Sequence, residues 1–329
     1  MTVPAPAPRR RLLLLGAAAA LPASRASAAS PGAATLLVPG PDDGALQRWS
    51  ARVAAAVPRS SASRVERKVL GGPDGVTAAN RFATQVEPDG RTLLVLCGGA
   101  AQARLVGDPR AHFDAAGWAP VCAAEGMALV AGRAAPPPGG AAVRVAFAGA
   151  HSPAAAALCG LSMMGLDAVP VAVAGSLQAE AAFQEGSVDA VLLHGADVPA
   201  RLTALSARPW FTLDADGRRD AAWPDVPCMS ELVFGPTVLR AAARSVAAAA
   251  RLHAAVVLPA LTPSDRVASW RAAAARWTEA EARSASAAGM RALSGAEAAP
   301  MLAAALAPAP EAALAYRDWL LRRFHWRAA

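Results

Sequence analysis

Apolar and polar positions alternate in blocks along this chain, and the blocks follow the same order three times. Each time, a short run of apolar residues ends at a glycine-containing turn, and a helix-like segment follows the turn. The three segments are TLLVPGPDDGALQRWSARVAAAV (35–57), RTLLVLCGGAAQARLV (91–106) and VRVAFAGAHSPAAAALCGLSMMG (143–165). Short apolar runs bounded by turn residues are typical of buried strands. The pattern therefore predicts strand, loop and helix three times, with strands at 35–38 and 92–96.

Further elements follow from the same reading. Apolar spacing at Leu46, Trp49 and Val53 predicts a helix after the first loop. A helix is also expected from Ser176 to Glu185, before the apolar strand VDAVLL, and the tail is predicted to be helical through YRDWLLRRF. The segment AAPPPGGAAVR (134–144) is the clearest break in composition, and it predicts a boundary between two α/β units.

Continuous apolar strands that alternate with helices indicate a mostly parallel sheet covered on both faces. In such sheets the loops at the carboxyl ends of the strands form the ligand crevice. Free N–H groups and the helix dipole favour a negative group at each following helix start. The glycine loops are therefore expected to hold a small anion. Ser152 is expected to cap the third helix, with Pro153 in its first turn.

The first 28 residues have the pattern of a secretory signal. A basic start, a twelve-residue apolar run from Leu12 to Ala23 and a small-residue exit at Ala26–Ala28 follow one another. The apolar run is shorter than the roughly 20 residues that span a bilayer, so we interpret it as cleaved. The arginines at 9–11 leave both the general secretory and the twin-arginine routes open. The mature protein is expected outside the cytoplasm.

Composition excludes some classes of protein. The chain has 329 residues, of which 54% are hydrophobic, and this favours two globular domains. Four arginines in residues 1–28 account for four of the seven net positive charges, and Lys68 is the only lysine. No basic run with interleaved aromatics suggests a nucleic-acid surface. Four dispersed cysteines, at 97, 122, 159 and 228, contain no C-x-x-C and leave both disulfides and free thiols open.

The sequence resembles the periplasmic solute receptors of tripartite tricarboxylate transporters, the TctC or Bug type, over nearly the whole mature chain. The elements PDG-x-TLL (88–94) and G-x-VD (186–189) are the most specific matches. The segments LLVPGPDDGALQRWSARVAAAV, GWAPVCAAEGMALV, WPDVPCMSEL and LPALTPSDRV occur in the order that the family shows.

The resemblance implies an α/β, two-lobed, periplasmic-binding-protein-like (type II) clamshell, each lobe a mostly parallel sheet flanked by helices. One lobe would comprise 29–130 with 255–329, and the other 131–254. It also implies a monomer without catalytic chemistry, cofactor or metal. Such a receptor would hand a small organic acid or amino-acid-like solute to membrane permease subunits, or serve a sensor.

Carried over by position, the resemblance implies a set of ligand-binding residues in four loops and one helix start. These are Gly40, Pro41, Asp42, Asp43, Gly44, Thr77, Cys97, Gly98 and Gly99 from one lobe, and Gly149, Ala150, His151, Ser152, Val173, Ala174 and Gly175 from the other. The family's second-lobe loop commonly reads PYKG, where this chain has Ala172–Gly175. Fewer side-chain donors are therefore expected around the solute.

The role of Asp42 and Asp43 stays open. They either contact a ligand amine or occupy the first turn of a helix, where acids are favoured without any function.

Two other functions are alternatives to solute transport. One is a receptor that docks on a membrane sensor or partner without transport. The other, a secreted hydrolase, is disfavoured because no G-x-S-x-G elbow occurs, GLSMMG has the wrong spacing, and nucleotide-binding and H-E-x-x-H motifs are missing from the sequence.

Overall fold

Strands and helices alternate from residue 34 onward, as the sequence segments predicted. The computed structural model describes residues 33–41, 44–57, 64–137, 141–214, 216–221, 223–285 and 290–327. The predicted signal and the residues Asp42 and Asp43 lie outside these ranges. The strands are β1 (Ala34–Val38), β2 (Val65–Val69), β3 (Thr92–Leu96), β4 (Ala119–Gly132), β5 (Ala142–Phe147), β6 (Asp167–Ala172), β7 (Ala190–Gly195), β8 (Arg208–Thr212), β9 (Leu252–Leu258) and β10 (Met290–Ser294).

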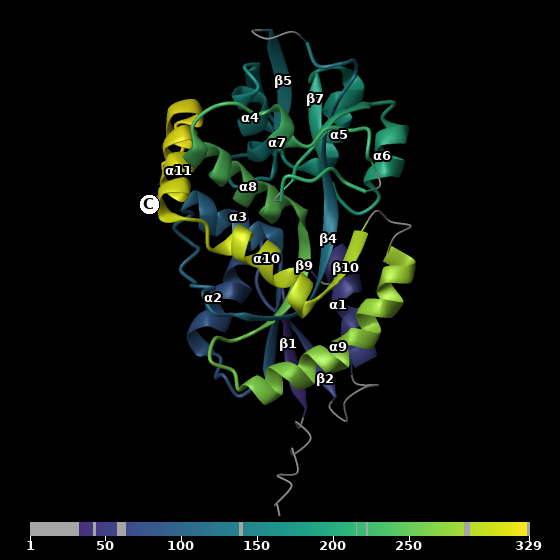
Figure 1. Cartoon of the computed structure of the whole chain (residues 1–329), viewed down its shortest axis with the longest axis vertical. Helices are drawn as coiled ribbons and strands as arrows, with labels where there is room; N and C mark the ends of the chain where they lie inside the picture. Colours follow the sequence, from purple (N-terminus) through teal and green to yellow (C-terminus); the bar gives the residue numbers. More distant parts are fainter. Residues whose placement is uncertain are drawn as a thin grey trace, which may run out of the picture. The chain divides into compact units, whose positions relative to one another are not determined.

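The helices connect these strands and cover their faces (Figure 1). They are α1 (Ala45–Ala56), α2 (Val76–Gln85), α3 (Gly98–Val106), α4 (Ala154–Met163), α5 (Ser176–Glu185), α6 (Val198–Ala204), α7 (Met229–Leu232), α8 (Thr237–Arg251), α9 (Ser264–Ala285), α10 (Gly295–Leu306) and α11 (Pro310–Phe324). The predicted strand 92–96 and the predicted helix 176–185 match β3 and α5 at both ends.

The strands form two regions of one sheet, and each region contains a parallel set. β1 pairs in parallel with β2 and β3, and β5 pairs in parallel with β6 and β7. The strands between these sets, β9, β4, β8 and β10, pair antiparallel with their neighbours. We call the region with β1, β2, β3, β9 and β10 the first lobe, and the region with β5, β6, β7 and β8 the second lobe. The fold is thus α/β and two-lobed.

β4 belongs to both lobes. Its first half, up to Gly126, pairs with β9 and β10, and its second half, from Met127, pairs with β7 and β8. At the change of partners, a Cβ atom added to Gly126 would lie 3.0 Å from the Cα atom of Gly195, so the backbones approach closely there. The predicted lobe boundaries, between residues 130 and 131 and between residues 254 and 255, stay a prediction.

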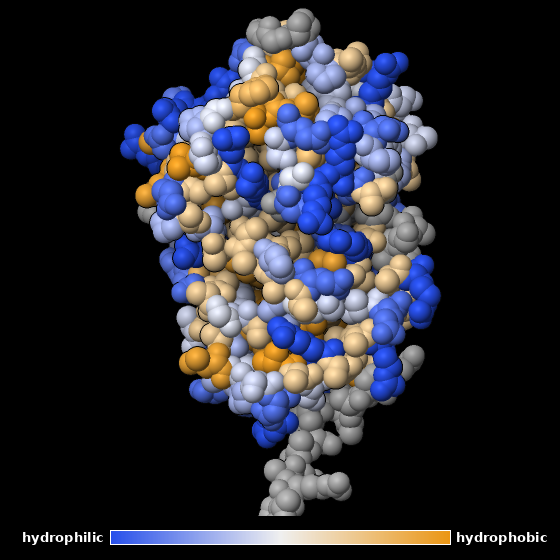
Figure 2. Space-filling model, in the orientation of Figure 1, coloured by the Kyte–Doolittle hydropathy of each residue, from blue (hydrophilic) through white to orange (hydrophobic). Residues whose placement is uncertain are grey.

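Four hydrophobic clusters fill the space between helices and sheet. In the first lobe, α1 and α9 cover one face around Trp49, Trp270 and Trp277, and α2, α3 and α10 cover the other around Phe82 and Phe113. In the second lobe, α4, α8 and α11 cover one face and α5 and α6 the other. Figure 2 shows pale orange side chains over α10, in agreement with its alanine-rich sequence, whereas most of the alanines of α8 are buried. Small side chains of this kind let helices pack closely.

All four cysteines are buried. Cys97, Cys122, Cys159 and Cys228 are free thiols, so the structure contains no disulfide among them. Burial raises the pKa of Cys122 and of Cys159 to about 12.

Among the described residues, no single helix has the length and hydropathy of a membrane span. The helices α10 and α11 have them only when taken together, as a pair bent by 51°.

Candidate functional site

The loops that follow the three parallel strands of the first lobe meet at Gly75. A Cβ atom added there would lie 2.7 Å from the Sγ atom of Cys97 and 3.3 Å from the Cγ atom of Pro39. Gly75 has φ 75°, a left-handed conformation that glycine adopts at no steric cost. Gly40 is buried, and its added Cβ would lie 2.5 Å from the carbonyl oxygen of Gly71. The ends of these three loops are thus packed together in one place.

Thr77 and Gly44 lie at the edges of this group of loops. Thr77 is exposed in the first turn of α2. A Cβ atom added to Gly71 would lie 2.5 Å from the Cβ atom of Thr77. Gly44 is the N-cap residue of α1 and accepts a backbone hydrogen bond from Arg48. Gln47 in the same helix is buried and donates to the carbonyl oxygen of Pro39 at 2.7 Å. Its amide therefore fixes the loop that includes Gly40 and Pro41.

The predicted loop Cys97–Gly99 is shorter than expected, because α3 already begins at Gly98. Gly98 is buried against the junction of α8 and β9, where its added Cβ would lie 2.1 Å from the carbonyl oxygen of Ala249. Gly99 is half-buried against the backbone of Asp74. Burial raises the pKa of the Cys97 thiol, and hydrogen bonds from the N–H groups of Ala100 and Gly99 act in the opposite direction. The start of α3 is therefore closely packed by the protein itself.

The start of α2 already holds a carboxylate. Asp74 accepts a hydrogen bond from the N–H group of Val76 at 3.2 Å, and it accepts another from Arg110 at 2.9 Å. Arg110 also forms two hydrogen bonds with the buried Asp108, at 3.1 and 2.7 Å. This guanidinium holds the pKa of Asp108 below its ordinary value. A second anion is disfavoured next to Asp74, so the first lobe offers little at this helix start to a carboxylate.

The second-lobe loop Gly149–Ser152 follows β5 and folds tightly on itself. Gly149 has φ 126°, a conformation that requires glycine, and the His151 imidazole lies against it. The Ser152 hydroxyl donates to the carbonyl oxygen of Gly149 at 2.7 Å. The prediction that Ser152 caps α4 is wrong, because Pro153 is at the N-cap position and no side chain caps the helix. The hydroxyl satisfies its own turn instead, as serine often does in loops.

The second predicted loop of this lobe, Val173–Gly175, follows β6 and is more open. The N–H group of Val173 donates to the carbonyl oxygen of Phe147 at 3.1 Å, which ties this loop to the end of β5. The N–H group of Ala174 donates to the side chain of Gln178. Nothing lies within 4 Å of a Cβ atom added to Gly175, the N-cap residue of α5. The first turn of α5 contains no acidic residue.

One side chain joins the loops of the two lobes. Gln102 lies in α3, one turn after Gly98, and is only 1% exposed. Its amide donates to the carbonyl oxygen of Ala150 at 3.5 Å. The loops at 97–99 and 149–152 are therefore neighbours, separated by about one helical turn of α3. The sequence-based prediction missed Gln102, although it is the only uncharged polar side chain in the segment GGAAQARLV.

Two ionisable residues lie in β7 or next to it. His194 is half-buried in β7 and paired with Ala128 of β4. Burial, then Arg201 and His253, lower its pKa to about 4. Asp189 precedes β7 and forms a two-point ion pair with Arg144 at 3.0 and 2.7 Å.

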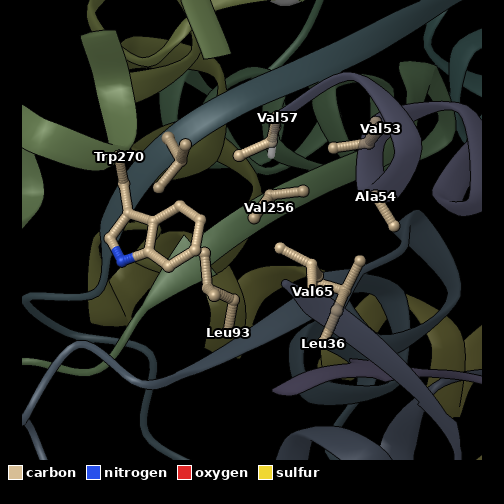
Figure 3. Close-up of a pocket in the computed structure, with 9 residues that line it drawn as sticks. Leu36, Val53, Ala54, Val57, Val65, Leu93, Val256 and Trp270 are labelled. Atoms are coloured by element: carbon tan, nitrogen blue, oxygen red, sulfur yellow. The ribbon is translucent and has the colours of Figure 1, made fainter. Parts of the chain in front are cut away.

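Two cavities lie away from the candidate loops. One, of about 20 Å³, lies between α1 and the sheet, where Val53, Val57 and Trp270 surround it (Figure 3). The other, of about 160 Å³, lies between α10 and the segment 115–118. Of the predicted ligand-binding residues that the structure describes, none lines either cavity. Within the described ranges, no group of three His, Cys, Asp or Glu side chains is placed to hold a metal ion.

Two α/β lobes on a shared strand are the arrangement found in periplasmic binding proteins. A TctC solute-binding protein from Polaromonas, solved without ligand, has this fold with a TM-score of 0.66 and 18% sequence identity. The match covers 88% of this chain and 98% of that protein.

Two proteins from Rhodopseudomonas palustris are also similar. MatC, solved with bound malate, has a TM-score of 0.55 and 24% identity, with 87% of this chain and 98% of that one covered. A second protein, solved with adipate, has a TM-score of 0.57 and 20% identity, with 89% and 97% covered. No protein-family model and no curated protein matches the sequence. The similarity is therefore one of fold.

Proposed function

We propose that this chain is a divergent solute-binding protein of the TctC or Bug type that captures a small carboxylated organic solute between its lobes. The observation that carries the proposal is the match of fold over almost nine-tenths of the chain to receptors that include one with malate and one with adipate. The carboxyl ends of parallel strands, which hold ligands in open α/β sheets, lead in both lobes into the candidate loops.

The two lobes would contribute unequally to such a site. In the first lobe, the start of α2 is occupied by Asp74 and the start of α3 is packed against α8 and Cys97. In the second lobe, neither α4 nor α5 has an acidic residue in its first turn. Because an anion is favoured at an unoccupied helix start, the solute's carboxylate would bind the second lobe. The first lobe would then close over the rest of the solute.

The sequence pattern of residues 1–28 supports export to the periplasm, where a membrane permease of the tripartite tricarboxylate type would receive the solute. Export is tested by placing residues 1–28 before a reporter enzyme that is active only outside the cytoplasm. A reporter that stays inactive would contradict it. Replacing Arg9 and Arg10 by lysine distinguishes the two export routes, since only the twin-arginine route requires the pair.

Solute binding is tested by thermal unfolding of the mature protein with malate, adipate, other organic acids and amino acids, followed by calorimetric titration. A solute at 100 times its Kd should stabilise the protein by about 2.7 kcal/mol, which is visible as a higher Tm. Replacing Gly175, which has open space around it, by valine should reduce the shift without loss of folding. Turnover of a binding compound would favour an enzyme. The failure of a broad panel would favour a protein that docks on a membrane sensor.

A further inference from the structure

The last helix and the chain's final residues hold the carboxyl end of α3. Arg317 in α11 donates to the carbonyl oxygens of Leu105 at 3.0 Å and Arg104 at 3.1 Å. The indole N–H group of Trp326 donates to the carbonyl oxygen of Val106 at 3.2 Å. The last carbonyl groups of a helix have no partner within the helix. Donors from α11 and the tail therefore reach three of these carbonyls in α3, and the carbonyl of Arg104 also accepts from the N–H group of Gly107.

The same helix is fixed to the second lobe. Arg323 donates to the carboxylate of Asp167 at 2.8 Å and to the carbonyl oxygen of Ala168 at 2.7 Å, both in β6. Phe324 stacks on Phe147, the last residue of β5, with 4.8 Å between ring centroids. α11 also shares one hydrophobic cluster with α4 and with the end of α3. It therefore links α3 to the strands that carry the second-lobe loops.

Trp326 reaches one of those loops directly. Its ring lies 6.4 Å from the imidazole of His151, measured between centroids. On the same loop, the carbonyl oxygen of Ala150 accepts the hydrogen bond from Gln102 of α3. The loop Gly149–Ser152 is thus held between α3 and the tail. The tail lies outside every loop that the sequence predicted for solute binding.

We propose that Trp326 and Arg317 are positioning residues that fix α3 against the loop Gly149–Ser152, and so determine how tightly that loop holds a solute. The effect on solute affinity rests on the proposed function, whereas the effect on the order of the loop does not. The Ser152 hydroxyl and the buried Ala150 hold the turn itself, and its contacts with α3 and with the tail are made by Gln102 and by the indole. Loss of the contacts with α3 or with the tail should therefore loosen the turn.

The experiment compares three variants of the full mature chain with the wild type. Trp326→Phe keeps an aromatic ring and removes the N–H donor, Trp326→Ala removes both, and Arg317→Met removes the two donors to α3. Arg322→Ala is the matched control, because Arg322 lies in the same helix, is exposed and forms a local ion pair with Asp318. Amide hydrogen exchange without solute is measured for 98–108 and 149–156, and peptides from β1 and β3 serve as internal references.

We expect exchange at 98–108 and 149–156 to accelerate by about 2- to 30-fold in Trp326→Ala and Arg317→Met, the range given by typical couplings within a packed network. The exchange rates in Trp326→Phe should lie between those of the wild type and Trp326→Ala, and the rates in Arg322→Ala should equal those of the wild type. Unchanged exchange in the two stronger variants would overturn the proposal. An equal acceleration in β1 and β3 would also overturn it, because it would indicate general destabilisation.

Solute affinity forms the second readout, with malate and adipate as probes. The Kd should rise by about 2- to 30-fold in the variants that accelerate exchange. Local acceleration with an unchanged Kd would overturn the link between the tail and solute binding. If the wild type binds neither these probes nor the broader panel of acids, the proposed function fails. The exchange result still decides whether Trp326 and Arg317 position the loop.

Discussion

The amide of Gln102 donates a hydrogen bond to the carbonyl oxygen of Ala150, and this contact connects loops that are about fifty residues apart in the sequence. Gln102 belongs to the helix that begins at Gly98, and Ala150 belongs to the tight turn after β5. This hydrogen bond therefore sets the distance between the two loops, and a solute that contacts both would meet them at that distance.

The hydroxyl of Ser152 should contribute to the stability of its turn. Ser152→Ala removes the 2.7 Å hydrogen bond to the carbonyl oxygen of Gly149, and we expect a loss of about 1 kcal/mol in the free energy of unfolding. Ser187→Ala is the control, because its hydroxyl forms a similar 2.9 Å bond to Ala182 at the end of α5. Both variants should be destabilised alike in urea titrations, and only Ser152→Ala should weaken solute binding. Equal affinity in both would contradict a site at this loop.

Glycines in the two sets of loops should respond differently to substitution. In Gly98→Ala, the new Cβ would lie 2.1 Å from a backbone oxygen that has little freedom to move, so we expect a loss of about 1–3 kcal/mol or more. In Gly175→Ala, the new Cβ has open space, and the free energy of unfolding should change by less than about 0.5 kcal/mol. Denaturant unfolding of both variants measures the difference. A tolerated Gly98→Ala would show that α3 is not packed against α8 as described.

Acid should destabilise the protein partly through His194. Its pKa is lowered from 6.5 to about 4, first by burial and then by Arg201 and His253, so the unfolded state binds the proton more readily. Stability should therefore fall as the pH falls from about 6.5 to about 4, by up to about 1.4 kcal/mol per pH unit from this group. His194→Gln should reduce this slope in Tm measurements from pH 7 to pH 4.5. A slope that His194→Gln leaves unchanged would contradict this role for His194.

The carboxylate of Glu125 should be essential where β4 changes lobes. Glu125 is 8% exposed and accepts hydrogen bonds from Arg251 at 2.9 Å and from Arg291 at 2.6 Å. Glu125→Gln would deprive the mostly buried guanidinium of Arg251 of one of its two carboxylate partners, the other being Asp220, and we expect a loss of about 1.5–3 kcal/mol. A double-mutant cycle with Arg291→Ala in denaturant unfolding measures the coupling. Additive losses would indicate that Glu125 and Arg291 act independently.

Local patterns were sufficient to predict several elements but not the contacts between them. β3 and α5 were predicted to the residue because an apolar run or a helical segment ends at a turn signal on each side. β2 was missed because its sequence, VERKV, is mostly exposed at an edge of the sheet and carries no apolar run. The shared role of β4 was missed because all its partners are distant in the chain.

For the candidate site too, positions along the chain were predicted but contacts were not. The glycine loops were predicted by position, but the sequence did not reveal that Asp74 occupies the start of α2 or that Cys97 is packed beneath Gly75. It also gave no reason to include Trp326, which lies about 175 residues from His151 in the chain. Contacts of this kind depend on how whole elements pack, and a local reading of composition and spacing has no access to that information.

The shared strand restricts how this protein can be divided. Thirteen of the fourteen residues of β4 are buried, and its two halves pair with different sets of strands. Expressing either lobe by itself would leave half of β4 as a bare apolar edge, which is the kind of edge that promotes aggregation. The halves of this molecule should therefore be obtainable only together.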